Sequence, residues 1–266
     1  MPFKKMTDAD TDVVMELLNR NKLANIGQIS TIRLLGMNGE DYAVYGEYVD
    51  DTLAAVIALY KNLGAGYYAE STRDISEAVE LLKSLPWVYF QGRKHLIQPF
   101  VPYLDHRMTD ETQLAVTSLY DDWAVNDTEL TTMTTEEELQ ECMDVTFQIE
   151  EFEKTRNTSK EEMIAEMKDN YFRIKDGMMV YLRKEGRIVA TARTICETDD
   201  HAMVQAVATL PEERRKGYAT TIIQYLMNVY KKKNKHLCLT FNNPEAARIY
   251  HRLGFVDQDD FMALLR

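Results

Sequence analysis

A short basic loop between an apolar run and an amphipathic helix constrains this chain more than any other segment. The run at 203–211 contains several β-branched residues and stops at a proline, which predicts a strand. From Tyr218 to Tyr230 the apolar residues recur at the spacing of one buried helix face. The amides of a first helical turn attract anions, glycine allows close approach, and Arg and Lys add charged donors. The loop at 214–220 is therefore either a cradle for a diphosphate or an ordinary turn with solvated basic residues.

A second strand and helix follow, and the two segments together resemble a known family. The predicted strand His236–Phe241 ends at Asn242-Asn243-Pro244, where an asparagine can cap a helix that begins with proline. The chain is similar to the GNAT superfamily of acyl-CoA N-acyltransferases. The family's R/Q-x-x-G-x-G/A loop is matched by Arg214, Gly217 and Ala219. Its N-x-x-A-x-x-x-Y-x-x-x-G-F signature is matched by Asn243, Ala246, Tyr250, Gly254 and Phe255.

The resemblance implies an α/β (α+β) fold for residues 127–266, with a mixed, mostly antiparallel sheet flanked by helices. The order expected from the patterns is strand, two helices, a hairpin, the strand before the loop, helix, strand, helix and strand. The first strand is expected at 128–133, and the first helix begins at 135 and continues through Phe152. The hairpin pairs 178–183 with 187–193 around a glycine turn.

The resemblance also implies a binding site for acetyl-CoA as co-substrate, without a metal. In this family the strand before the loop binds the pantetheine arm like an added strand, and one of its amides stabilises the oxyanion. Val207 is expected to supply that amide, and Asn243 is expected to contact the pantetheine region. The residues expected to bind the cofactor are Val207, Ala208, Thr209, Arg214, Arg215, Lys216, Gly217, Tyr218, Ala219, Thr220 and Asn243.

Tyr250 is the expected catalytic residue. A phenol beside the sulfur can donate a proton to the departing thiolate as a general acid. Taken alone, a tyrosine on a buried helix face is more often a core aromatic, but its place in the motif favours the acid role. His251 points about 100° away on the same helix and is expected at the surface.

The general base remains open. Many members of the family carry a glutamate in one of the two strands beside the cofactor, and 202–205 and 237–240 contain no carboxylate. The base is then either Glu150, Glu151 or Glu197, or an ordered water relays the proton. Residues 127–200 carry an excess of acids, which is either a solvated helix face or an attraction for a cationic amine.

The first half, 1–126, predicts a smaller α/β domain. A hairpin at 41–47 and 52–60, a strand at 65–70, a helix at 75–85 and extended pieces at 88–90 and 96–103 echo the second half. This domain is either a degenerate GNAT repeat or an unrelated accessory domain. No counterpart of the basic loop lies between Tyr67 and its helix, so we expect no CoA site there.

Composition excludes several classes of protein. A net charge of −12 argues against a nucleic-acid binder, and no apolar stretch is long enough for a membrane span. Three scattered cysteines fit reduced thiols in a cytoplasmic protein better than disulfides or a zinc site.

The leading hypothesis is an N-acetyltransferase acting on a primary amine. The acceptor is a small cationic or amino-acid-like molecule, or a protein amine. The alternative is a non-catalytic protein that binds CoA as a sensor or scaffold. In a third hypothesis, the first half binds a protein substrate and presents it to the second half. The sequence leaves the oligomeric state open.

Overall fold

A computed structural model describes residues 3–37, 39, 41–61, 63–117, 125, 130–156 and 158–266. The chain divides into two units. The first comprises Met1–Leu114 together with Gln258–Arg266, and the second comprises Ala115–Asp257. The division expected at residues 126 and 127 lies outside the described residues. The last nine residues lie with the first unit rather than with the second half, because their strand pairs with a strand of the first unit.

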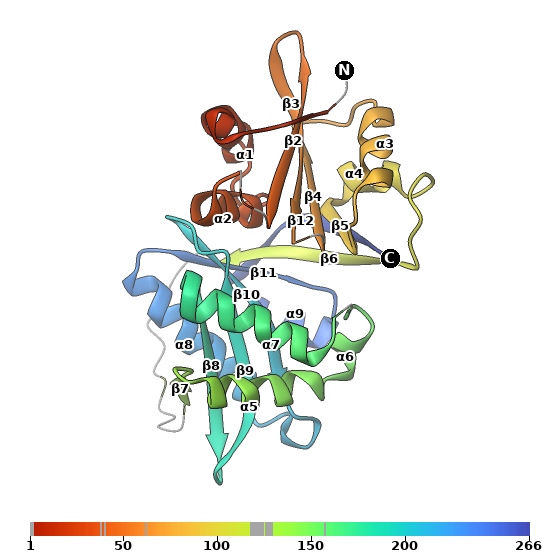
Figure 1. Ribbon diagram of the computed structural model, residues 1–266. Helices are drawn as coiled ribbons and strands as arrows, with labels where there is room; N and C mark the ends of the chain where they lie inside the picture. The colour runs from red at the N-terminus through yellow and green to blue at the C-terminus, as the bar shows by residue number, and fades with distance from the viewer. Residues whose placement is uncertain are drawn as a thin grey trace. The chain divides into compact units, whose positions relative to one another are not determined.

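The first unit is a mixed sheet between two pairs of helices (Figure 1). Its strand order is β1-β2-β3-β4-β5-β12, with antiparallel pairs except for the parallel pair β4 and β5. The strands are β1 (Lys4–Lys5), β2 (Tyr42–Val49), β3 (Thr52–Tyr60), β4 (Gly64–Ala69), β5 (Tyr89–Arg93) and β12 (Phe255–Leu265). A further strand, β6 (Met108–Thr117), begins in this unit. The helices are α1 (Thr11–Asn19), α2 (Ile26–Leu35), α3 (Ser76–Ser84) and α4 (Lys94–Ile97).

The segment 96–103, expected to be extended, is helical at its start. Leu96 and Ile97 belong to α4, and Gln98–Phe100 form a 3-10 turn. The turn accommodates Pro99 near its beginning, where the missing N–H costs no hydrogen bond. Leu96, Ile97 and Phe100 are buried, so the segment packs one side against the core instead of alternating like a strand.

In the part of the chain that the structure describes, the second unit has a mixed sheet with helices on both faces (Figure 1). Its order is β11-β10-β9-β8-β7, and only β10 and β11 are parallel. The strands are β7 (Leu130–Thr132), β8 (Met178–Lys184), β9 (Arg187–Ile195), β10 (His201–Thr209) and β11 (His236–Phe241). The helices are α5 (Glu136–Phe147), α6 (Glu150–Glu153), α7 (Lys160–Lys168), α8 (Tyr218–Lys232) and α9 (Pro244–Arg252). The expected mixed, mostly antiparallel sheet flanked by helices is confirmed.

Two boundaries of the second unit differ from the expected ones. The predicted first strand is described from Leu130 onward, because residues 128 and 129 lie outside the described part. The predicted long first helix ends at Phe147 and resumes as α6 at Glu150. Ile149 between them is extended and buried, so its side chain anchors the break in the core.

Two apolar clusters fill the faces of this sheet. One lies under α8 and α9 and includes Val204, Ile222, Leu226 and Tyr250. The other lies under α5 and α7 and includes Leu139, Cys142, Met167 and Ala208. Val207 of β10 packs against the first cluster and its neighbour Ala208 belongs to the second, so the strand lies between the two clusters.

Candidate active site

The carboxyl half of β10 has a main chain without complete strand pairing. Its parallel ladder with β11 runs only from His201↔His236 to Met203↔Cys238, although both strands continue beyond these pairs. On the other side, a bulge separates the pairs Gln205↔Arg193 and Ala208↔Thr191. Ala206 in the bulge has φ +49°, a left-handed conformation that is uncommon for a residue other than glycine. Ala206 and Val207 consequently have no partner residue in either neighbouring ladder.

The loop after β10 brings uncapped helix amides to the same end of the strand. Gly217 occupies the N-cap of α8 at φ +86°, and no side chain caps the helix. The first intrahelical bond runs from the amide of Thr221 to the carbonyl of Gly217, 3.0 Å. The amides of Tyr218, Ala219 and Thr220 therefore have no partner within the helix. Arg215 is also left-handed, at φ +66°, and such alternating backbone forms an anion-binding concavity.

The basic side chains of the loop differ in how they are held. Arg214 makes a two-point ion pair with Glu151 of α6, with Nη1–Oε1 at 2.9 Å and Nη2–Oε2 at 3.0 Å. Lys216 pairs with Glu213 at 2.7 Å. Arg215 is exposed and has no ion pair with any residue that the structure describes. It is thus the loop cation that is most available to a ligand.

A fourth cation, missed by sequence reasoning, lies beside the loop. Arg252, in the last turn of α9, donates from Nη2 to Oγ1 of Thr220 at 3.2 Å. This contact brings its guanidinium next to the first turn of α8. Its position two residues after Tyr250 was visible in the sequence, but only the packing of α9 on α8 shows where it lies.

The three strand residues expected at the cofactor lie at the bulge or just after it. Val207 packs against the cluster under α8, whereas Ala208 is buried in the cluster under α5. The Oγ1 of Thr209 is buried and has no hydrogen-bond partner among the described residues. The main-chain carbonyl of Thr209 accepts a long bond of 3.4 Å from Nε of Arg214.

Asn243 and Tyr250 both have structural roles in α9. Asn243 caps the helix, with Oδ1 accepting from the amide of Glu245 at 2.9 Å. Tyr250 is 8% exposed, and its ring contacts Phe241 and Phe255 at centroid distances of 5.5 and 5.8 Å. Its hydroxyl has no hydrogen-bond partner among the residues described here, and burial raises its pKa to about 12. The phenol is therefore fully protonated at neutral pH.

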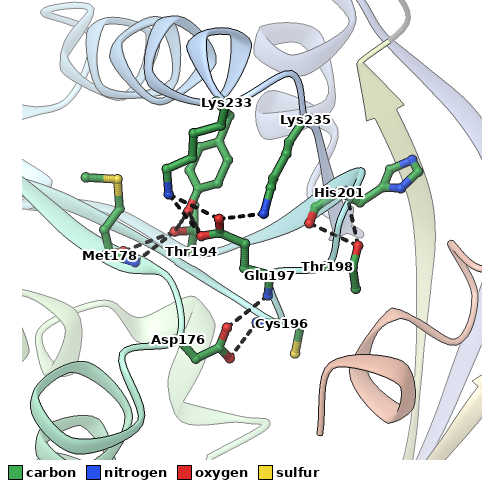
Figure 2. Close-up of polar contacts among 10 residues, drawn as sticks. Asp176, Met178, Thr194, Cys196, Glu197, Thr198, His201, Lys233 and Lys235 are labelled. Carbon is green, nitrogen blue, oxygen red and sulfur yellow. Dashed lines mark hydrogen bonds and ion pairs between the residues drawn. The ribbon is translucent and has the colours of Figure 1, made fainter. Parts of the chain in front are cut away.

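Two of the candidate bases are poorly suited to that role. The bond from Arg214 holds the pKa of the Glu151 carboxyl below its usual value. Glu197 accepts from Lys235 at 2.7 Å and from Lys233 at 3.1 Å, as Figure 2 shows. Burial opposes its ionised form, but the two lysines outweigh burial and hold the pKa below its usual value. Glu197 also lies in the loop between β9 and β10, before the first residue of β10, and that strand runs about 20 Å from His201 to Val207.

Over the described ranges, no three His, Cys, Asp or Glu side chains are placed to hold a metal ion. Within the same part of the chain, no helix has the length and apolar character that crossing a membrane requires.

Comparison with known proteins identifies the second unit. The acetyltransferase (GNAT) family model matches residues 132–255. No curated protein matches the chain.

Solved structures share the fold over almost the whole chain. A GCN5-related N-acetyltransferase from Sphaerobacter thermophilus has a TM-score of 0.64 at 14% identity, over 98% of this chain and 94% of that one. A tandem GNAT protein from the clavulanic acid biosynthesis pathway has 0.62 at 11%, over 99% and 98%. A Drosophila protein has 0.68 at 11%, also over 99% and 98%. The match identifies residues 132–255 as a GNAT acetyltransferase domain, and the protein is an acyltransferase.

Proposed function

We propose that the protein transfers an acetyl group from acetyl-CoA to a primary amine by direct attack. The observation that carries this proposal is the combination of uncapped α8 amides with the unpaired main chain of Ala206 and Val207. The amides of 217–220 and the Arg215 side chain would bind the pyrophosphate, and the β10 edge would bind the pantetheine. Three free cysteines are in keeping with a cytoplasmic location.

The chemistry follows from this placement. The amine nitrogen attacks the thioester carbonyl carbon, and the amide of Val207 stabilises the oxyanion that forms. When the carbon–sulfur bond breaks, Tyr250 gives its proton to the leaving sulfur. The attacking amine loses its proton before or during this step. Glu150 has no ion pair among the described residues, so it and an ordered water remain the candidates for the base.

We propose further that the first unit is a degenerate copy without a CoA site. Its strands β4 and β5 pair in parallel over three positions, like β10 and β11. Beyond them, a Cβ on Gly92 would lie 2.7 Å from the carbonyl oxygen of Tyr67, so the strands are too close for an inserted chain. The first turn of α3 carries Glu77 and follows Asp74, which bonds the Ser76 amide. This helix end therefore repels an anion.

One observation favours a second candidate function. Tyr250 is packed between two aromatic rings and Asn243 caps its helix, so both motif residues are accounted for by folding alone. A protein that binds CoA without catalysis would keep them for that reason. Release of free thiol from acetyl-CoA in the presence of a panel of amines separates the two functions.

Substitution of the proposed acid tests the mechanism. Tyr250→Phe keeps the ring contacts and removes the proton donor, so kcat should fall by about 100-fold with little change in CoA affinity. Tyr225→Phe is the matched control, because Tyr225 lies on α8 with its hydroxyl 3.3 Å from Thr132 and away from the proposed sulfur. If both variants turn over like the wild type, Tyr250 is not the acid.

A further inference from the structure

A polar cluster of three residues lies on the face of β9 and β10 that packs against α7. Gln205 and Arg193 are directly opposite in the antiparallel ladder, so their side chains share a face. Arg193 donates from Nη2 to Oε1 of Gln205 at 3.2 Å and points Nη1 at the sulfur of Met167 at 3.1 Å. Tyr171, in the turn after α7, is the third member. Its phenol is near enough for the Arg193 charge to lower its pKa, although burial raises that pKa overall.

The donors of this cluster are not all satisfied. Nε of Arg193 and the hydroxyl of Tyr171 are both buried without a hydrogen-bond partner. Methionine sulfur is a weak acceptor, and the glutamine amide is uncharged. Neither is a carboxylate, and Arg193 has no carboxylate partner among the described residues. Charged groups that are withdrawn from water are normally paired.

Two carboxylates near this end of the sheet, Asp176 before β8 and Glu197 after β9, bind other partners (Figure 2). Asp176 accepts from the amides of Cys196 and Glu197 at 2.8 and 2.9 Å. Glu197 is bound by Lys233 and Lys235. The Arg193 cluster is thus a partly buried positive group that lacks an anion, and each buried unsatisfied donor calls for an explanation.

The cluster lies next to the proposed reaction centre. Gln205 immediately precedes the bulge, and Val207 is two residues further, or within about 8 Å along the main chain. The opposite face of β10 is closed by the apolar cluster under α8, where Val204 is 3% exposed. Arg193 and Gln205 on the other face are partly exposed, so an acceptor that reaches an acyl group at Val207 approaches from their side.

We propose that Arg193 determines acceptor specificity by binding a carboxylate, so that the acceptor is an amino acid or a similar amine that carries a carboxylate. This inference rests on the proposed function of the β10 site. Gln205 positions the guanidinium, which offers the planar donors that suit a carboxylate, and Tyr171 adds a hydroxyl donor. A polyamine lacks the anionic group and would meet a like charge.

The test uses the full chain and acetyl-CoA, with thiol release as the readout. A panel of free amino acids is compared with their methyl esters and with spermidine, which lack the carboxylate. For at least one amino acid, kcat/KM should exceed that of its methyl ester by about 100-fold, the size of a charge-assisted contact. Arg193→Gln should bring this ratio close to one, and Arg193→Lys should restore part of it. Arg183→Gln should leave the ratio unchanged, because Arg183, on β8, already pairs with Glu141 of α5.

Binding gives an independent readout. The preferred amino acid should raise the melting temperature of the wild type in the presence of CoA, and this rise should be lost in Arg193→Gln. If the methyl esters or spermidine react as well as the free acids, the inference is wrong while the proposed function stands. If no amine at all is acetylated, the proposed function fails and this inference fails with it.

Discussion

Replacing Gly217 by alanine tests whether the loop before α8 is an anion cradle. A Cβ built on Gly217 meets no atom within 4 Å, so the substitution causes no steric clash. Its cost comes from φ +86°, a left-handed conformation that an L-residue adopts at about 1–2 kcal/mol. The alanine loop should therefore relax toward a negative φ and turn the first amides of α8 away from the ligand.

Binding of CoA must then restore the left-handed conformation. A strain of about 1–2 kcal/mol corresponds to a rise in Kd of about 5- to 30-fold. Isothermal titration calorimetry with CoA measures this change directly. Gly217→Asn should lose less affinity, because asparagine tolerates the left-handed region better than alanine.

Gly186 offers a closely matched control. It lies in the turn between β8 and β9 at φ +80°, and a Cβ there also meets nothing within 4 Å. Gly186→Ala should carry a similar backbone strain and leave the affinity for CoA unchanged. If Gly217→Ala binds CoA as tightly as Gly186→Ala and the wild type, the amides of this loop do not hold the pyrophosphate.

Three further predictions follow from the charges and the core. Burial raises the pKa of Tyr250 to about 12, and the protonated form is the active acid. The acetylation rate should therefore stay level or rise between about pH 7 and 10, because the amine loses its proton in this range. If the rate instead falls toward pH 10 and Tyr250→Phe abolishes this fall, Tyr250 is not an acid with a raised pKa. Arg215→Gln should weaken CoA binding by about 3- to 10-fold at low salt. Lys216→Gln should weaken it less, because Lys216 is already paired with Glu213. Equal losses of affinity in calorimetry would refute this ranking. Leu264→Ala, at a fully buried position of β12, should lower the free energy of unfolding by about 2–5 kcal/mol in urea denaturation. Val256→Ala on the same strand, where the side chain is 46% exposed, should change the free energy of unfolding by no more than about 0.5 kcal/mol. If Leu264→Ala causes a loss as small as that, β12 is not part of the core.

The elements with a local signal were predicted well. Helix α8 begins at Tyr218 as the glycine before it indicates, and α9 begins at Pro244 behind its asparagine cap. The strand β11 has the predicted bounds, His236–Phe241. Capping and periodicity depend on neighbours in the sequence, so they can be recognised without knowledge of the fold.

Features that depend on distant partners were not predictable. The pairing of β12 with β5 joins strands that are far apart in the sequence, so nothing local indicates it. The pairing of Arg214 with Glu151, and of Arg193 with Gln205, depends on helix packing and on strand register. Sequence reasoning placed Arg214 and Glu151 in separate roles, as a loop cation and a candidate base, because nothing local links residues that are 63 positions apart.

The return of β12 to the first unit has a consequence for synthesis of the chain. Residues 1–114 leave the ribosome long before residues 258–265, so the edge of β5 stays unpaired until those later residues have been made. An open strand edge is a template for wrong pairing with other chains. The sheet of the first unit is therefore completed only after the second unit has been made, and removal of residues 258–266 would damage the unit made first.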